Sequence, residues 1–268
     1  MSIQALFSSA VPVLSLAPMQ DVTDLPFWRL MARYGGADLY FTEFFRVTPH
    51  YSPEKSILRS ITENPTGRPA IAQIIGNDLE AMARTAKALE KHPVAAVDLN
   101  LGCPAPVVYR KCAGGGLLRD LPRVDELLGV LRAAIAGSFT VKTRLGFADP
   151  AEFDALLEVF SKHKLDLLTV HGRTVAEKYG PHVHLDRMAQ AVRHLPFPVQ
   201  ANVNVTSAES ALSLISKRTP MAVRPATCMS IGRDPKSSPP GISSRTRPQQ
   251  ASNGPRRLIE ARILVTNS

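Results

Sequence analysis

Short apolar runs that are typical of β-strands alternate with longer runs that have helical spacing over most of the chain. Gly35 and Gly36 end the first helical run, Asp78 is placed to cap the second, and Pro122 stands in the first turn of the third. Seven strands are predicted, at residues 13–17, 39–42, 70–75, 95–99, 139–144, 166–171 and 198–202. The helical runs lie at 24–34, 79–92, 122–136, 152–163, 185–194 and 206–217.

Seven strand-then-helix units in about 217 residues fit a (β/α)8 barrel that lacks its last unit. The alternative is a doubly wound open sheet, which gathers its polar residues at one crevice. Here polar residues follow nearly every strand, and the glycine fingerprint GxGxxG of dinucleotide-binding sheets is absent. We therefore predict an α/β fold, a TIM barrel that is incomplete at the eighth unit.

The composition changes abruptly after Lys217. Residues 218–257 contain no leucine and no aromatic residue but many Pro, Arg and Ser residues, a composition that buries too little apolar surface to order itself. Within this segment only 227–232 (TCMSIG) can form a short eighth strand. We therefore predict a barrel domain at 1–217 and an irregular, disordered basic tail at 218–268.

The formal net charge of +9 is concentrated in that tail. Residues 1–217 carry 23 basic and 21 acidic side chains, whereas residues 218–268 carry 9 and 2. The predicted barrel is thus nearly neutral, and the overall charge by itself is weak support for a nucleic-acid partner.

No apolar run has the ~18–20 residues that a membrane span needs, and the N-terminus lacks the basic start of a signal peptide. The three cysteines, Cys103, Cys112 and Cys228, form no CxxC pair, which favours reduced thiols over a disulfide framework. His182 and His184 form an HxH pair without an apparent third ligand, so we expect no metal. A cytoplasmic protein is the expectation.

The stretch at 97–118, VDLNLGCPAPVVYRKCAGGGLL, runs from a strand directly into a glycine-framed turn that carries Cys103. In parallel α/β folds ligands bind at this end of the strands. Polar side chains at the other strand ends would converge there, and amides with a lysine and a histidine suit a flavin nucleotide. They are Met19, Gln20, Glu43, Gln73, Asn100, Lys142, Arg144, His171, Arg173, Asn202 and Asn204.

Each of these residues also has a structural interpretation. Cys103 alone can be a small buried hydrophobe, Lys142 a solvated or paired cation, and His171 a core histidine with satisfied hydrogen bonds. For the glycines at 114–116 we favour close chain packing over phosphate binding. The aromatic residues Tyr34, Tyr40, Phe41, Phe44 and Phe45 are expected in the core or in a pocket wall.

Several segments together resemble the tRNA-dihydrouridine synthases. They are LAPMQDVTDLPFWRLM, YFTEFFRV, AIAQIIGND, VDLNLGCPAPVVYRKCAGGGLLRD, VKTRLGF, LTVHGRT and PVQANVNVTSA, in this order and within residues 11–217. The resemblance implies a barrel that binds flavin mononucleotide (FMN) and reduces the C5–C6 double bond of uridine in tRNA, using NADPH. We expect a monomer.

By position, the resemblance implies that Cys103 is the catalytic cysteine. It implies that Pro18 and Met19 lie in the loop beneath the flavin, and that Asn100 lies near the substrate base. Gln73, Lys142 and His171 match flavin contacts, and Asn202 and Asn204 match the segment at the flavin phosphate. We expect the remaining cations of the strand ends, Arg144 and Arg173, to contact the substrate.

The implied reaction explains the choice of a thiol. After hydride reaches uridine C6, an acid must protonate C5, and an ordinary thiol with a pKa of ~8.5 is mostly protonated at neutral pH. A nucleophilic cysteine would instead need a depressed pKa.

The chain departs from the family pattern in three places. Val203 stands where the family has glycine in Asn-Gly-Asp, and a β-branched residue there would be strained if the backbone needed a positive φ. The phosphate loop after strand eight has only Ile231-Gly232-Arg233 as a displaced candidate. No helical tRNA-binding domain is recognisable, so a truncated or frame-shifted C-terminus is our hypothesis. Alternatives are another FMN barrel, such as a dihydroorotate-type dehydrogenase or an ene-reductase, and an inactive remnant.

Overall fold

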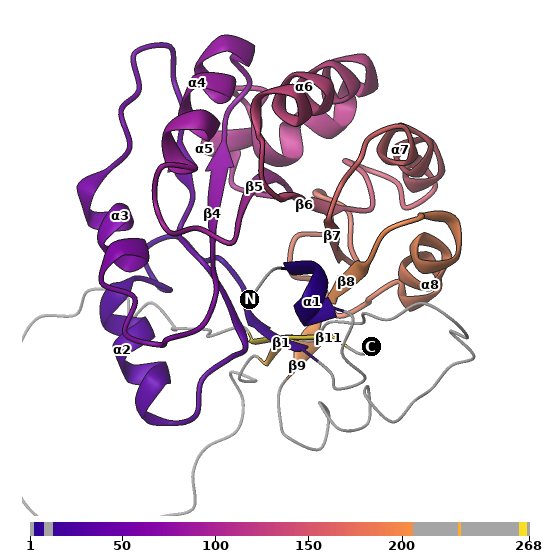
Figure 1. Ribbon diagram of the computed structural model, residues 1–268. Helices are drawn as coiled ribbons and strands as arrows, with labels where there is room; N and C mark the ends of the chain where they lie inside the picture. Colours follow the sequence, from indigo (N-terminus) through magenta and orange to yellow (C-terminus); the bar gives the residue numbers. More distant parts are fainter. Residues whose placement is uncertain (1–2, 8–12, 206–229, 232–262, 267–268) are drawn as a thin grey trace, which may run out of the picture.

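A computed structural model of the chain describes residues 3–7, 13–205, 230–231 and 263–266. Its main sheet follows the strand order β11-β1-β2-β4-β5-β6-β7-β8, and neighbouring strands from β1 to β8 run parallel. Helices lie round the outside of the curved sheet, from α2 and α3 through α6 to α7 and α8 (Figure 1). The architecture is a (β/α)8 barrel that is incomplete at its eighth unit, as predicted.

All seven predicted strands are present within one or two residues of their expected bounds. They are β1 (Val13–Leu16), β2 (Leu39–Phe41), β4 (Ala70–Ile75), β5 (Ala96–Leu101), β6 (Phe139–Arg144), β7 (Leu167–His171) and β8 (Val199–Asn202). The short strand β3 (Phe45–Arg46), which also pairs with β4, was not predicted because two residues carry no periodic signal.

Five predicted helices are confirmed, namely α2 (Leu25–Arg33), α4 (Leu79–Leu89), α6 (Leu121–Ala134), α7 (Glu152–Ser161) and α8 (Leu185–His194). The carboxylate of Asp78 accepts from the Ala81 amide at 2.8 Å, the expected N-cap. Gly35 and Gly36 follow α2 with φ of +96° and +62°, which end the helix. The predicted helix at 206–217 lies outside the described residues.

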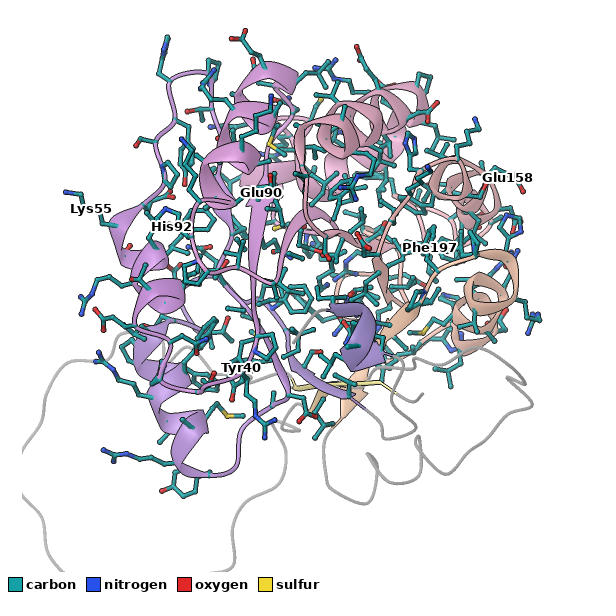
Figure 2. All side chains as sticks on the ribbon, viewed as in Figure 1. Tyr40, Lys55, Glu90, His92, Glu158 and Phe197 are labelled. Atoms are coloured by element: carbon teal, nitrogen blue, oxygen red, sulfur yellow. The ribbon has the colours of Figure 1, made fainter. Side chains whose placement is uncertain are left out.

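The sequence did not indicate four shorter helical elements. They are α1 (Ile3–Phe7), α3 (Lys55–Thr62), α5 (Pro106–Tyr109) and the 3₁₀ segment η1 (Gly114–Arg119). Ile3 and Phe7 of α1 are buried and join the main apolar core. Lys55 of α3 and Glu158 of α7 point away from the protein, whereas Tyr40 of β2 lies buried against Trp28 of α2 (Figure 2).

Two pieces of the segment that was expected to be irregular form strands. β10 (Ser230–Ile231) pairs in parallel with β9 (Asn204–Val205), within the run that was the candidate eighth strand. β11 (Ile263–Thr266) pairs antiparallel with β1 and also lies beside β8, so it stands between the first and last strands of the barrel. The domain boundary at 217 lies outside the described residues.

Among the helices of the described residues, none is both long enough and apolar enough to cross a bilayer.

Leu128 of α6 is fully buried in the core, and Leu30 of α2 is about half exposed. We expect Leu128→Ala to lower the free energy of unfolding by about 2–5 kcal/mol, because it removes apolar contacts and leaves a cavity. The matched surface change Leu30→Ala should cost about 0.5 kcal/mol or less. Urea unfolding of both variants measures the difference, and equal losses would contradict this placement of the core.

Candidate functional site

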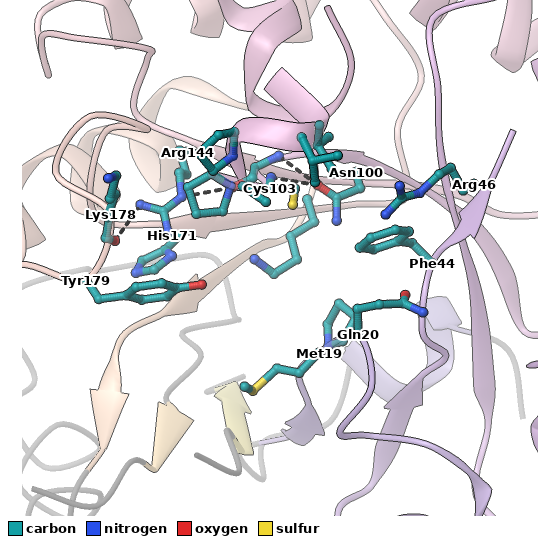
Figure 3. A pocket seen from close by; sticks show the side chains of 18 of the residues that line it. Met19, Gln20, Phe44, Arg46, Asn100, Cys103, Arg144, His171, Lys178 and Tyr179 are labelled. Carbon is teal, nitrogen blue, oxygen red and sulfur yellow. Dashed lines mark hydrogen bonds between the residues drawn. The ribbon is translucent and has the colours of Figure 1, made fainter. Parts of the chain in front are cut away.

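A pocket of about 500 Å³ opens at the carboxyl ends of the barrel strands (Figure 3). Its volume is within the range of small-molecule sites. The loop after β1, the turn after β5, the strands β6 and β7, and the segment after β7 all contribute to its lining. Eight of the predicted residues line it, namely Pro18, Met19, Gln20, Asn100, Cys103, Lys142, Arg144 and His171.

Cys103 lies in the turn that leaves β5 and is half-buried. The side-chain oxygen of Asn100 accepts hydrogen bonds from the amides of Gly102 at 2.9 Å and Cys103 at 3.0 Å. On its other side, the Cys103 carbonyl accepts from the Gly115 amide at 3.2 Å. The turn is therefore held from both sides, and the thiol has a defined position at the pocket.

The run Gly114–Gly116 packs against this turn, as the sequence predicted. A Cβ on Gly115 would lie 2.9 Å from the Cys103 carbonyl oxygen, and one on Gly116 would lie 2.4 Å from the Tyr109 carbonyl oxygen. Gly114 has a φ of +52°, which favours glycine. These glycines allow η1 to approach the cysteine turn closely, and no phosphate role is needed to explain them.

Lys142 and His171 reach the pocket from two adjacent strands, because side chains at alternate positions of β6 and β7 point into the barrel. The ammonium of Lys142 lies 3.5 Å from the side-chain oxygen of Asn202, the last residue of β8. Asn202 is 2% exposed, and its Nδ2 has no hydrogen-bond partner among the described residues. A buried amide N–H without a partner is costly, and Asn202 itself lies behind the residues that line the pocket.

Gln73 does not line the pocket but lies directly behind it. Its side-chain oxygen accepts from Asn100 Nδ2 at 2.7 Å, and its Nε2 donates to Asp98 at 2.8 Å. Asp98 also accepts from the Thr140 hydroxyl at 2.6 Å. Burial raises the pKa of Asp98 to about 6, although both hydrogen bonds and the nearby charge of Lys142 oppose this shift.

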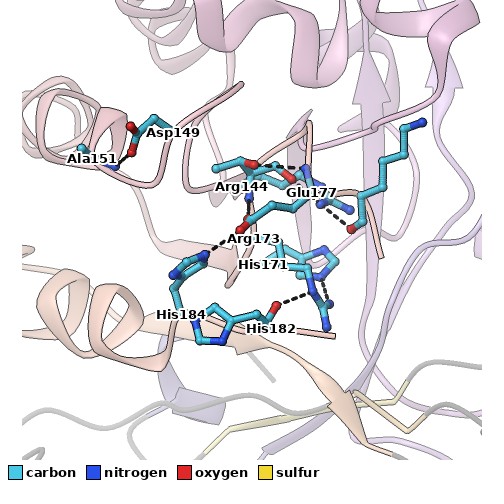
Figure 4. A network of polar contacts seen from close by, with 10 residues as sticks. Arg144, Asp149, Ala151, His171, Arg173, Glu177, His182 and His184 are labelled. Carbon is cyan, nitrogen blue, oxygen red and sulfur yellow. Dashed lines mark hydrogen bonds and ion pairs between the residues drawn. The ribbon is translucent and has the colours of Figure 1, made fainter. Parts of the chain in front are cut away.

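The two arginines that were expected to contact substrate are both 1% exposed and hold loops. Arg144 donates to the carbonyls of Gly102, Thr174 and Lys178 at 2.7–2.9 Å, and so joins the cysteine turn to the segment after β7. Arg173 does not line the pocket; it donates to the His182 carbonyl at 2.8 Å and lies 3.0 Å from His171 Nε2 (Figure 4). Substrate contact by these side chains stays a prediction.

The remaining predicted site residue, Asn204, lies in β9, and its side chain is outside the described residues. Its neighbour Val203 is buried and has no positive φ, so the valine at the family's glycine position is not strained there. His184 of the HxH pair lies 2.7 Å from Glu177 and so helps to hold the segment after β7.

Phe44 lines the pocket as predicted and belongs to a small apolar cluster against which Cys103 packs, and the Arg46 guanidinium lies 5.6 Å from its ring centre. The same prediction was wrong for Tyr34, which is 82% exposed. Nearby, the Glu43 carboxylate accepts from the Asp21 amide at 2.5 Å, and burial raises the pKa of Glu43. Asp21 itself has a φ of +59°. Glu43 therefore holds the loop that carries Pro18 and Met19 in a conformation that costs backbone strain.

Tyr179 forms part of the pocket rim and is 57% exposed. Sequence reasoning missed Tyr179 and Arg46 because neither follows a predicted strand directly. It also missed Asp98, although an acidic residue inside the apolar run AAVDL is a detectable signal. With Asn100, it lies on the inward face of β5.

The site can therefore present a thiol, a lysine ammonium and a histidine to one planar ligand between partly apolar walls, and the unpaired amide N–H of Asn202 lies behind this lining. Among the lining residues, Lys142 and His171 are buried, whereas Arg46, Lys178 and Tyr179 are exposed.

The family model described as "Dihydrouridine synthase (Dus)" matches residues 15–249. A tRNA-dihydrouridine synthase B of Pseudomonas putida is 35% identical over 204 residues, which are 75% of this chain and 60% of the relative. A tRNA-dihydrouridine(16) synthase of Ralstonia nicotianae is 32% identical over 200 residues, covering 72% of this chain and 61% of the relative. The chain thus spans about 60% of the length of the curated relatives it matches.

Among solved structures, a variant of NCR from Zymomonas mobilis aligns with 75% of this chain and 77% of its own. The TM-score is 0.49 at 14% identity, which is too slight a likeness to carry any conclusion.

The raised pKa of Asp98 predicts a pH-dependent stability. The folded state binds this proton more tightly than the unfolded state, so the stabilising contribution is complete below about pH 4 and is lost as the pH rises through about 6. Relative to Asp98→Asn, which does not titrate, the native free energy of unfolding should fall by on the order of 3 kcal/mol across this window. Urea unfolding at a series of pH values tests this, and parallel curves for the two proteins would contradict it.

Proposed function

The chain belongs to the dihydrouridine synthase family, and from this we propose that it reduces the C5–C6 double bond of uridine in tRNA. In this proposal FMN is the bound cofactor and NADPH the reductant. The observation that carries it is Cys103, held by Asn100 and Gly115 at a pocket that also receives Lys142 and His171. A thiol held at the pocket in this way supports a role as proton donor to a bound base.

The described residues fit the ring system of a flavin. Such a ring is planar and carries acceptor atoms along one edge, so it needs apolar walls together with a few donors. Phe44, Pro18 and Met19 supply apolar surface and Lys142 supplies a donor at the lining, with Asn202 Nδ2 behind it. The candidate phosphate residues Gly232 and Arg233 lie outside the described residues.

A flavin held at this pocket and reduced by NADPH would supply the hydride for uridine C6. The protein's own groups then have separate tasks. The ammonium of Lys142 offsets negative charge at the edge of the flavin ring, where a buried cation acts strongly. The Asn202 Nδ2, which has no partner within the described residues, would gain one only from a ligand that reaches past Lys142.

Cys103 completes the reaction by donating its proton to uridine C5. The turn that holds it contributes no acidic side chain, and its fixed backbone keeps the thiol in one place during the transfer. Arg144 supports the same turn through the Gly102 carbonyl, so that the thiol and the segment after β7 keep their relative positions. We propose that the protein acts on tRNA as a monomer in the cytoplasm.

The role of the thiol is tested by Cys103→Ala. We expect uridine reduction to fall by at least about 10²-fold, because the general acid is lost, while FMN stays bound and NADPH still reduces it. The dihydrouridine content of a previously unmodified tRNA and the flavin absorbance measure the two effects. The exposed Cys112→Ala is the matched control and should keep full activity. Equal loss of flavin and of uridine reduction would show that the thiol is structural.

The cofactor site is tested by Lys142→Met, which keeps the length of the side chain but removes its charge. We expect FMN to bind about tenfold more weakly or worse, since one charge-assisted contact is lost in a site shielded from water. Quenching of flavin fluorescence gives the dissociation constant, and the melting temperature without FMN shows whether the barrel is intact. Lys162→Met, on the exposed end of α7, is the control. Unchanged binding by Lys142→Met would contradict this flavin pose.

A further inference from the structure

A directed chain of hydrogen bonds runs through the barrel interior from Thr140 to the cysteine turn. The Thr140 hydroxyl and Gln73 Nε2 donate to the two oxygens of Asp98 at 2.6 and 2.8 Å. Gln73 Oε1 accepts from Asn100 Nδ2 at 2.7 Å. Asn100 Oδ1 in turn accepts from the amides of Gly102 and Cys103.

Both ends of this chain have fixed polarity. A backbone N–H can only donate and an ionised carboxylate can only accept, whereas each side-chain amide between them can be turned either way. With Asp98 accepting at one end and the turn donating at the other, only one orientation of Gln73 and Asn100 makes every contact a donor–acceptor pair. The carboxylate and the turn therefore require the same orientation of both amides, and the carboxylate anchors the end of the chain that is remote from the turn.

We propose that Asp98 is a positioning residue for Cys103. Asp98 is fully buried and does not line the pocket, so its hydrogen-bonded route to the cysteine turn runs through Gln73 and Asn100, while its charge also lies near Lys142. It fixes the orientation of both amides and thereby the acceptor that holds the cysteine turn. The catalytic part of this inference rests on the proposed function, whereas the structural part does not.

The cost of burying Asp98 supports this role. An apolar side chain could fill the same space without desolvating a charge, and such replacements are often neutral or stabilising. A second set of buried, hydrogen-bonded side chains in the barrel contrasts with the chain that contains Asp98. There Thr169 donates to Gln200 and Gln200 donates to Ser15, without any charged residue. Because hydroxyl groups both donate and accept, that group does not impose a direction on its amide.

The test compares two variants of Asp98. Asp98→Leu removes the acceptor. Asp98→Asn keeps one acceptor oxygen for Gln73, and the Thr140 hydroxyl can rotate to accept from the new side-chain amide. Thr169→Val is the matched control, because it removes a buried hydroxyl from the group that does not reach the turn. Gln73→Met breaks the chain at its middle and replaces Asp98→Leu if that variant does not fold. Hydrogen exchange of the Gly102 and Cys103 amides, followed by NMR on the full chain without tRNA, is the readout.

We expect exchange at both amides to be about tenfold faster in Asp98→Leu, the loss expected for one hydrogen bond. Asp98→Asn and Thr169→Val should stay near the native rates. If the protein is active, kcat for tRNA reduction should fall in Asp98→Leu while KM for tRNA stays unchanged. Native exchange rates in Asp98→Leu, or equal acceleration in Asp98→Leu and Thr169→Val, would overturn the proposal. A protein inactive on tRNA that still shows the exchange pattern would refute the proposed function alone.

Discussion

The register between parallel strands is the constraint on which the site depends. Gln73 is paired with Asp98, Asn100 with Lys142, and Arg144 with His171 across neighbouring strands. His171 is paired in turn with Asn202. A slip of one residue in any of these pairings would send a whole set of inward side chains to the outer face. The regular backbone hydrogen bonds of the sheet therefore assemble the pocket and the residues directly behind it from positions between 73 and 202 of the chain.

The interior of this barrel is polar where many barrels are filled by branched apolar residues. Ser15, Gln73, Asp98, Thr140, Thr169 and Gln200 are all fully buried. Their polar groups bond to one another, so burial leaves few of them unsatisfied. Such an interior holds side chains in one arrangement, which is what a site needs when its groups must be placed to within a fraction of an ångström. Stability then comes mainly from the apolar layer between strands and helices.

Strong periodicity made the barrel predictable from the sequence, because each strand and helix repeats its apolar spacing over several residues. The convergence of Cys103, Lys142 and His171 followed from topology alone, since parallel strands bring their carboxyl ends together. The sequence did not predict which of these side chains reach the pocket and which stay buried behind its lining. Gln73 and Asn202 lie in strands just as Lys142 does, and Arg173 comes two residues after β7. None of these three lines the pocket, because strand tilt and neighbouring bulk decide which residue reaches the cavity. The pairing of β11 with β1 joins residues about 250 positions apart, for which local sequence carries no signal.

The hydrogen bond from the Gly115 amide to the Cys103 carbonyl closes residues 103–115 into a loop, and the glycines at 114–116 pack closely where this loop closes. Arg110 and Lys111 lie exposed in the middle of this loop sequence, several residues from its closing hydrogen bond. Asn100 holds Cys103 from one side and Gly115 holds it from the other, so cleavage by trypsin after Arg110 or Lys111 would leave the Cys103 sulfur in place. An insertion next to Cys103 or Gly115 would instead displace the sulfur. This short loop thus tolerates chain cleavage near residues 110–111 but does not tolerate an insertion where it is closed.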